Sequence, residues 1–219
     1  MSGSYLSFSI ISSYYLLMIV GGSFLMSHAE ENVSLIDIQE GRLGSYLLKP
    51  FLYFFLKWFE EVPNRLLQGG FGVLTLILVV LILHVHINII FSGFINSVLI
   101  LLIIFGAVLL AQLYKMNLAF ITFWVTDAGG FFQLSEMLLF IFAGYIVPLS
   151  LYPTQVAAIA YILPFSYMIY FPVAAVEGIF SVVQLCSILL AQVLWVGIFV
   201  LFYKFLWNKG INQFTGVGQ

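Results

Sequence analysis

Charged side chains are scarce in this sequence. Lys and Arg together number 7 and Asp and Glu number 9, which is 7% of the 219 residues, while 63% are hydrophobic. Soluble domains carry about 25% charged residues, and a water-soluble fold of this composition would expose far too much apolar surface. The composition therefore predicts an integral membrane protein, whose spanning segments must be helices or a closed barrel. It contains no basic patch, so we expect no nucleic acid among its partners.

Several chemical devices are also missing. The single cysteine, Cys186, lies in an apolar stretch, which excludes a disulfide framework and a cysteine-based metal site. The ATP-binding motif G-x-x-x-x-G-K-[ST] and the hydrolase motifs G-x-S-x-G and H-E-x-x-H have no match in the chain. His84 and His86 are two residues apart, and such residues face different directions on a helix. We therefore expect no cofactor, no metal site and no enzymatic activity of the chain's own.

What the chain has instead is a series of long apolar runs. Runs near twenty residues have the length of spanning helices, whereas barrel strands would alternate over about ten residues. The runs cover about residues 5–27, 70–91, 94–114, 134–149 and 179–203. The first run has no Lys or Arg before it, unlike a secretory signal. The sequence predicts an all-α membrane protein with five transmembrane helices in a single domain, residues 1–219.

All the cations can be placed on one side of this arrangement. Lys and Arg gather in cytoplasmic loops because they resist translocation, so residues 29–68 and the C-terminus are predicted to be cytoplasmic. Residues 115–135 either extend the third run or lie at the membrane interface. The N-terminus would lie outside with no charge to hold it there, and we expect that the chain lacks a first spanning helix. The cations are Arg42, Lys49, Lys57, Arg65, Lys115, Lys204 and Lys209.

A proline-punctuated apolar stretch separates the last two runs, between Pro148 and Pro172. Proline removes a backbone donor and clashes with the preceding helical turn. Pieces of about ten residues reach about half of a ~30 Å hydrocarbon core. We predict that residues 151–178 form an outer re-entrant pair of short helices rather than one spanning helix. An ordinary outer loop is the alternative.

Three stretches carry a resemblance to a known family. They read IDIQEGRLGSYLLKPF, FAGYIVPLSLYPTQVAAIAYILPFSYMIYFPVAAVEG and QVLWVGIFVLFYKFLWNKGINQFTGVGQ. In order and spacing they resemble the permease subunits of bacterial ABC-2 type transporters, over nearly the whole chain. That family has six spans and two cytoplasmic termini, so this chain resembles a member without its first span. The matching positions are Ile38, Gly41, Leu43, Leu47, Leu48 and Pro50, followed by Gly144, Pro148, Leu149, Pro153, Leu163, Pro164, Phe165 and Pro172.

The loop before the second run has a helical pattern. Its apolar residues recur at helical spacing, at Val33, Ile36, Leu43 and Leu47. Ser34 and Asp37 fit a capping box. The resemblance implies that the cytoplasmic coupling loop, residues 29–68, docks into a groove of an ATPase, a mode that needs apolar anchors. The residues that it assigns to this contact are Ile36, Ile38, Glu40, Gly41, Arg42, Leu43 and Leu47. The alternative is an amphipathic helix lying on lipid headgroups.

Three acids lie near membrane depth. Asp127 is in a glycine-flanked turn, Glu136 is near the start of the fourth run, and Glu177 precedes the last run. An ionisable group inside a span is a functional candidate. These three are therefore candidates for a transport path, although each also suits an interfacial position.

The resemblance implies the permease subunit of an ATP-driven exporter in the bacterial inner membrane. Its partners would be two ATPase subunits, a second permease subunit and membrane lipid. The alternative is a membrane subunit for assembly or anchoring, or an intramembrane enzyme with an unrecognised site. Co-purification of an ATPase with a P-loop would separate these hypotheses.

Overall fold

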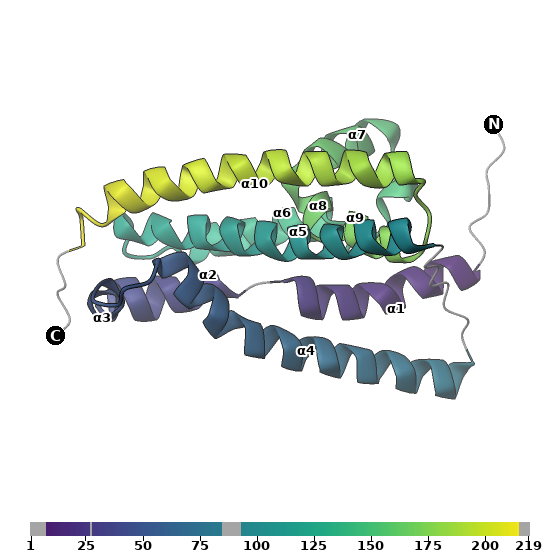
Figure 1. Cartoon of the computed structure of the whole chain (residues 1–219), viewed down its shortest axis with the longest axis horizontal. Helices are drawn as coiled ribbons and strands as arrows, with labels where there is room; N and C mark the ends of the chain where they lie inside the picture. Colours follow the sequence, from purple (N-terminus) through teal and green to yellow (C-terminus); the bar gives the residue numbers. More distant parts are fainter. Residues whose placement is uncertain (1–7, 27, 85–92, 215–219) are drawn as a thin grey trace.

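The structure is a computed structural model that describes residues 8–26, 28–84 and 93–214. Every regular element in these ranges is helical (Figure 1). The long helices are α1 (Phe8–Leu25), α4 (Tyr53–Leu83), α5 (Phe94–Ala119) and α10 (Val182–Gly210), and α6 (Gly129–Phe142) is shorter. The short elements are α2 (Ala29–Glu31), η1 (Asn32–Gln39), α3 (Leu43–Leu47), η2 (Phe120–Phe123), η3 (Leu149–Leu151), α7 (Thr154–Ile162), α8 (Pro164–Met168) and α9 (Tyr170–Val176).

The long helices lie roughly along one axis (Figure 1). Three of them are long and apolar enough to cross a bilayer: Tyr53–Leu83, the continuous α5 and η2 over Phe94–Phe123, and Val182–Gly210. The all-helical membrane fold predicted from the sequence is therefore confirmed. The count of five spans stays a prediction, because α1, with 18 residues, and α6, with 14, are not among these three.

The second apolar run begins earlier than the sequence predicts. α4 starts at Tyr53 and contains Lys57 and Arg65, so residues 53–68 are helical instead of part of a loop. Pro63 lies inside this helix. The part of the predicted coupling loop that lies outside α4 is therefore shorter and runs from Ala29 to Leu52.

Of residues 115–135, for which the sequence leaves two placements open, 115–123 extend the third run and 129–135 belong to α6. α5 continues through Lys115 to Ala119, and η2 follows without a break. Lys115 is 1% exposed and lies among buried neighbours. α6 begins at Gly129, and its end is followed by Gly144, whose φ of 81° lies in the left-handed region that favours glycine.

Residues 149–176 contain several short helices instead of one long one. The longest is α7, with 9 residues, and α8 begins directly at Pro164, where proline is tolerated at the first helical position. The prediction that no single spanning helix occupies this segment is confirmed. The structure has three short α-helices and one 3₁₀ turn there instead of a pair.

The core is centred on α5, which packs against α10, α8 and α9. Ile103, Met168 and Ile169 are fully buried in it. α4 packs mainly against α1, and two glycines permit the close approach. A Cβ on Gly69 would lie 2.9 Å from the ring of Phe24, and one on Gly72 would lie 3.2 Å from the Cα of Val20.

Candidate functional site

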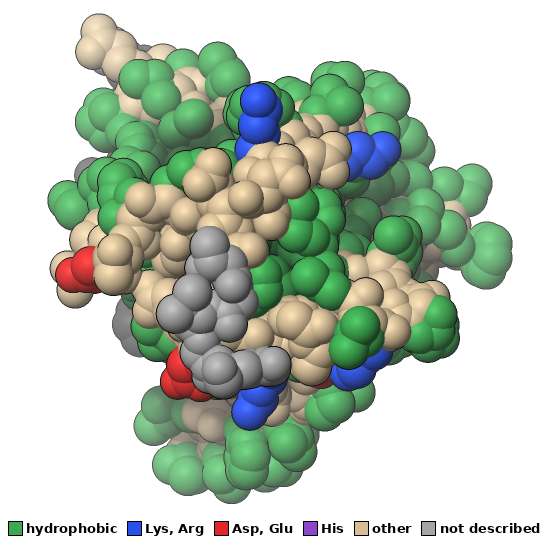
Figure 2. All heavy atoms as spheres, turned by 90° about the vertical axis from the view of Figure 1, so that its left-hand side faces the viewer, with side chains coloured by type: hydrophobic (Ala, Val, Ile, Leu, Met, Phe, Trp, Pro, Cys, Tyr) green, Lys and Arg blue, Asp and Glu red, His purple; other side chains and the backbone are tan. Residues whose placement is uncertain are grey.

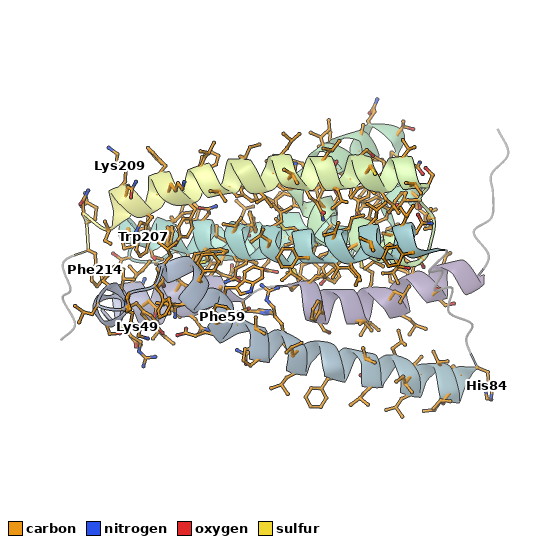
Figure 3. The ribbon with its side chains drawn as sticks, in the orientation of Figure 1. Lys49, Phe59, His84, Trp207, Lys209 and Phe214 are labelled. Atoms are coloured by element: carbon orange, nitrogen blue, oxygen red, sulfur yellow. The ribbon has the colours of Figure 1, made fainter. Side chains whose placement is uncertain are left out.

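One end of the molecule gathers the cations. It is formed by α3, the start of α4 and the carboxyl ends of α5 and α10, and we call it the cation-rich end. Lys49 and Lys209 lie there, while His84 lies at the opposite end (Figure 3). Figure 2 shows this end, with Lys and Arg side chains spaced around an apolar centre. Arg65 is the deepest cation, about 18 Å along α4 from Tyr53.

A buried ion pair fixes η1 onto α4. The Nζ atom of Lys57 lies 2.6 Å from Oδ2 of Asp37 and 2.8 Å from Oε2 of Glu60. The Tyr53 hydroxyl donates a second hydrogen bond of 2.6 Å to Asp37. Lys57 and Asp37 are both nearly inaccessible to solvent. Breaking such a pair leaves an uncompensated buried charge, so the position of η1 on α4 is strongly specified.

The first half of α4 is amphipathic with its charged face inward. Lys57, Glu61, Arg65 and Gly69 recur every four residues and are buried, because residues four apart share a helix face. The opposite face exposes large apolar side chains, among them Phe59 at 70%. Lipid on the outside and charged neighbours on the inside explain this arrangement, which is the reverse of the pattern in a soluble helix.

Glu61 and Arg65 bind the two helix ends that flank the break between α1 and α2. Arg65 donates a hydrogen bond of 3.0 Å to the carbonyl of Leu25, the last residue of α1. Glu61 accepts one of 3.1 Å from the backbone N–H of His28, directly before α2. A cation at the C-terminus of a helix and an anion at the N-terminus both interact favourably with the helix dipole. Arg65 also donates to Gln112 of α5 at 2.7 Å.

Lys115 joins three helices. Its Nζ atom lies 2.6 Å from Oε1 of Glu30 in α2 and also contacts Glu136 in α6. Glu136 lines an open cavity of about 670 Å³ between α1, α4 and α6. The other polar residues of this cavity include Ser23, His28, Gln68, Thr75 and Tyr145. The arrangement connects the buried lysine to a partly exposed carboxylate in a cavity whose lining is mixed polar and apolar.

The structure divides the residues that the sequence assigned to the coupling loop. Ile38 and Leu43 are buried within the chain, and Ile36 is half-buried. The exposed ones are Glu40, Arg42 and Leu47. Gly41 has a φ of 84°, which turns the chain between η1 and α3 and favours glycine there.

The expected capping box is wrong. Ser34 and Asp37 lie inside η1, which is a π-helix whose first flanking residue is Glu31. A capping box does occur at the start of α10, where Ser181 and Gln184 bond to each other's backbone N–H. The missed signal there was the same spacing, Ser-x-x-Gln, directly before an apolar run.

The remaining acids lie apart from this cluster. Asp127 is exposed and accepts a hydrogen bond of 2.9 Å from the N–H of Gly129, the first residue of α6. Glu177 is 6% exposed and follows α9. Burial raises the pKa of Glu177 to about 7, although a hydrogen bond from Ser13 opposes this shift.

Sequence reasoning missed the residues that hold the cation-rich end together. The sequence predicts a capping role for Asp37 and gives Glu30, Lys57 and Lys115 only a position relative to the membrane. The spacing of Lys57, Glu61 and Arg65 was the available signal, since residues four apart share a face. Their partners in α1, α2 and η1 are distant in sequence, and no local pattern indicates them.

Comparison with families of known proteins gives a match over nearly the whole chain. The family model described as "ABC-2 family transporter protein" matches residues 5–218. The chain therefore belongs to this family and is a membrane-spanning transport permease. No curated protein and no solved structure matches the chain.

Proposed function

We propose that this chain is the permease subunit of an ATP-driven ABC-2 exporter in a bacterial inner membrane. A separate ATPase would hydrolyse ATP, with two copies bound to two permease subunits. The family supports transport. The observation that carries the coupling role is the segment 29–52, which is fixed to α4 and α5 by buried ion pairs yet exposes Glu40, Arg42 and Leu47.

The proposed topology has five spans, which are α1, α4, α5, α6 and α10. The cation-rich end faces the cytoplasm because Lys and Arg resist translocation, and this places the C-terminus there as well. The short helices α7, α8 and α9 then form a re-entrant segment in the outer leaflet. Irregular backbone at that depth is tolerated where it is buried against protein, and Met168 and Ile169 have no exposed surface.

Movement would pass from the ATPase through η1 to the spans. The Asp37–Lys57 pair connects η1 to α4, and Lys115 connects α2 to α5 and α6. Because these contacts are directional and mostly buried, a displacement of residues 29–47 would be transmitted to three helices together.

The cavity between α1, α4 and α6 is the proposed start of the transport path. Of the three acids assigned to such a path, Glu136 lines this cavity. Asp127 and Glu177 lie elsewhere, and we propose that Asp127 stabilises the first turn of α6 through its bond to Gly129. Because Lys115 binds both Glu136 and Glu30 of α2, a movement of α2 would change the exposure of the Glu136 carboxylate.

The ATPase contact can be tested by co-purification in mild detergent. Arg42→Glu reverses an exposed charge in the coupling segment and should reduce recovery of a P-loop ATPase at least tenfold. Lys209→Glu is the matched control, since Lys209 is also exposed at the same end but lies on α10. Equal loss in both variants, or ATPase recovery unchanged in Arg42→Glu, would refute the assignment of this segment.

Leu43 and Leu47 give a second, sharper contrast. Leu43 is 1% exposed and Leu47 is 44% exposed. Leu43→Ala should lower the unfolding free energy by about 2–5 kcal/mol because it leaves a cavity, whereas Leu47→Ala should change it by less than about 0.5 kcal/mol. If Leu47 contacts the ATPase, Leu47→Ala should still weaken ATPase binding. Unfolding in mixed micelles and co-purification measure the two effects separately.

The family match does not favour the alternative of an anchoring subunit or an intramembrane enzyme. That alternative predicts purification without any ATPase, and no ATP-dependent transport in proteoliposomes. Either result, obtained with a chain that remains folded, would contradict the proposal.

A further inference from the structure

An apolar groove runs along the seam between α5 and α10 at the cation-rich end. It has a volume of about 640 Å³ and is lined almost entirely by apolar atoms. Phe105, Leu109 and Leu113 form its floor on α5. Val196 and Val200 continue along α10, and the start of α4 closes one side. Because these residues recur every four positions, each helix contributes one continuous stripe.

Two lysines lie at the mouth of this groove. Lys204 continues the α10 stripe, and Lys49 approaches from the turn after α3. Among the described residues, neither lysine is in an ion pair. The nearby Glu60 is already bound to Lys57 at 2.8 Å and to the Tyr46 hydroxyl at 2.7 Å. The Nζ atom of Lys49 lies 4.4 Å from the centroid of the Tyr46 ring. The mouth therefore carries two cations, neither of which is in an ion pair among the described residues.

The aromatic side chains at the mouth suit a membrane interface. Trp207 stacks on Tyr53 with ring centroids 4.9 Å apart, and both line the groove. Trp207 and Lys49 both lie at the cation-rich end (Figure 3). Trp and Tyr are enriched where lipid headgroups meet the hydrocarbon core. Lys204 lies one helical turn inside Trp207 on α10, so the lysines and the aromatic rings share the mouth of the groove, and the apolar interior follows along the helix axis.

The groove covers most of the depth of one leaflet. From Lys204 at the mouth to Val196, the α10 stripe advances by eight residues, which is about 12 Å of helix. Half of a ~30 Å hydrocarbon core is about 15 Å. An acyl chain whose headgroup sits at the lysines would therefore lie along the groove for most of the depth of the leaflet.

We propose that this groove binds one anionic phospholipid, with its phosphate at Lys49 and Lys204 and an acyl chain along α5 and α10. Basic pockets between spanning helices recognise such headgroups on the cytoplasmic side. A second copy of the chain is a poorer occupant. A symmetric contact through this groove would bring the lysines of both copies together without any anion between them.

The lipid would connect the coupling segment to α10. Lys49 follows α3 directly, while Lys204 lies near the end of α10, and no ion pair among the described residues joins these two elements. A phosphate held by both lysines would supply that missing connection. Loss of the lipid would then loosen α3 from α10 without removing any protein contact.

Native mass spectrometry of the full chain in mild detergent tests the headgroup. The probes are palmitoyl-oleoyl phosphatidylglycerol and palmitoyl-oleoyl phosphatidylcholine, which share acyl chains and differ in charge. We expect the anionic lipid to bind at least tenfold tighter. Lys49→Gln or Lys204→Gln alone should weaken it about fivefold and the double variant about thirtyfold, since each lysine near a headgroup contributes ~1 kcal/mol. The control is Arg42→Gln with Lys209→Gln, which removes two exposed cations of the same end outside the groove.

A second pair of variants tests the acyl chain. Leu109→Trp fills the groove without changing its charge and should abolish the preference for the anionic lipid over the phosphatidylcholine. Leu102→Trp, on an exposed part of α5 outside the groove, should leave it intact. Glycerol phosphate, which is a headgroup without chains, should not compete at the same concentration. Equal binding of the two lipids, equal loss in the control variant, competition by glycerol phosphate, or a change of oligomeric state without a change in lipid binding would overturn the proposal.

Discussion

The two halves of this molecule are held together by different forces. At the cation-rich end, buried charges join α2, η1, α4, α5 and α6, and all five ion pairs among the described residues lie there. In the opposite half, α7, α8 and α9 pack through apolar and aromatic side chains. Tyr167 and Phe171, for example, have ring centroids 4.7 Å apart. Glu177 is the buried carboxyl of this half, and no cation contributes to its pKa.

This difference corresponds to different mechanical properties. Buried ion pairs are directional and leave costly unpaired charges when they break. Apolar contacts are non-directional, so neighbouring helices can change their register with a smaller loss. The end that we propose to receive force from the ATPase is therefore the end whose contacts transmit displacement, while the half that would open outward has contacts that tolerate sliding.

The largest change in stability is expected at Lys115, the lysine that joins three helices. Lys115→Met keeps the length of the side chain but leaves Glu30 and Glu136 without their cation. Removal of one partner from a buried ion pair costs about 3–5 kcal/mol. We expect a loss of this size in the unfolding free energy, measured by denaturation in mixed micelles.

A combined variant separates charge from packing. Lys115→Met together with Glu30→Gln and Glu136→Gln removes all three charges, and such neutral replacements are often tolerated. Most of the lost stability should return in it. If Lys115→Met unfolds like the parent chain, or if the combined variant is as unstable as the single one, the charges do not hold this end together.

Glu177 provides the opposite test, because its half has no compensating cation. Burial raises its pKa to about 7, from an ordinary value of 4.5. Between these values the folded state holds a proton that the unfolded state has released, so stability falls as pH rises from 4.5 to 7. It is constant above that range. The slope is at most about 1.4 kcal/mol per pH unit.

Glu177→Gln cannot titrate and should remove this slope. The gain over the parent chain should be greatest above pH 7, where the parent carries a buried charge. Unfolding measured from pH 5 to pH 8 gives both curves. Parallel curves for the two proteins would mean that Glu177 does not titrate in this range.

The long apolar helices were predictable because their signal is local. Runs of uninterrupted apolar residues predicted α4, α5 and α10, and the prolines predicted the broken segment after Pro148. The helix boundaries were less predictable. α4 begins at Tyr53, although Lys57, Glu60 and Glu61 gave that stretch the composition of a loop. Glu60 and Glu61 pair with Lys57 and Arg65 of the same helix, and Asp37 of η1 supplies the distant partner of Lys57, which no local pattern indicates.

The candidate site was less predictable for the same reason. The apolar spacing of the coupling segment did not distinguish an inward face from an exposed one. Leu43 turned out to pack inside the chain, while Leu47, only four residues later, is exposed. α3 has just 5 residues, so its two apolar positions need not face the same environment. The inward side is set by η1, α4 and α5, which no local pattern identifies.

The smallest expected effect concerns the seam at which the two halves meet. Gln192 of α10 is 1% exposed, and its Nε2 atom donates hydrogen bonds of 3.0 Å to the carbonyls of Ile103 in α5 and Tyr167 in α8. Gly106 leaves room for this side chain, because a Cβ at that position would lie 2.7 Å from Oε1 of Gln192. Gly106→Ala should displace Gln192 and leave a buried amide without its partners.

Overpacking of this kind costs about 1–3 kcal/mol, and the higher helix propensity of alanine returns up to about 1 kcal/mol. We therefore expect a net loss of about 1–2 kcal/mol. Gly197→Ala is the matched control, because Gly197 also lies within a long helix but a Cβ there meets nothing within 4 Å. It should be neutral or stabilising. Equal unfolding free energies for the two variants would show that Gln192 does not need the space that Gly106 provides, and that the seam depends on apolar contacts, like the half beyond it.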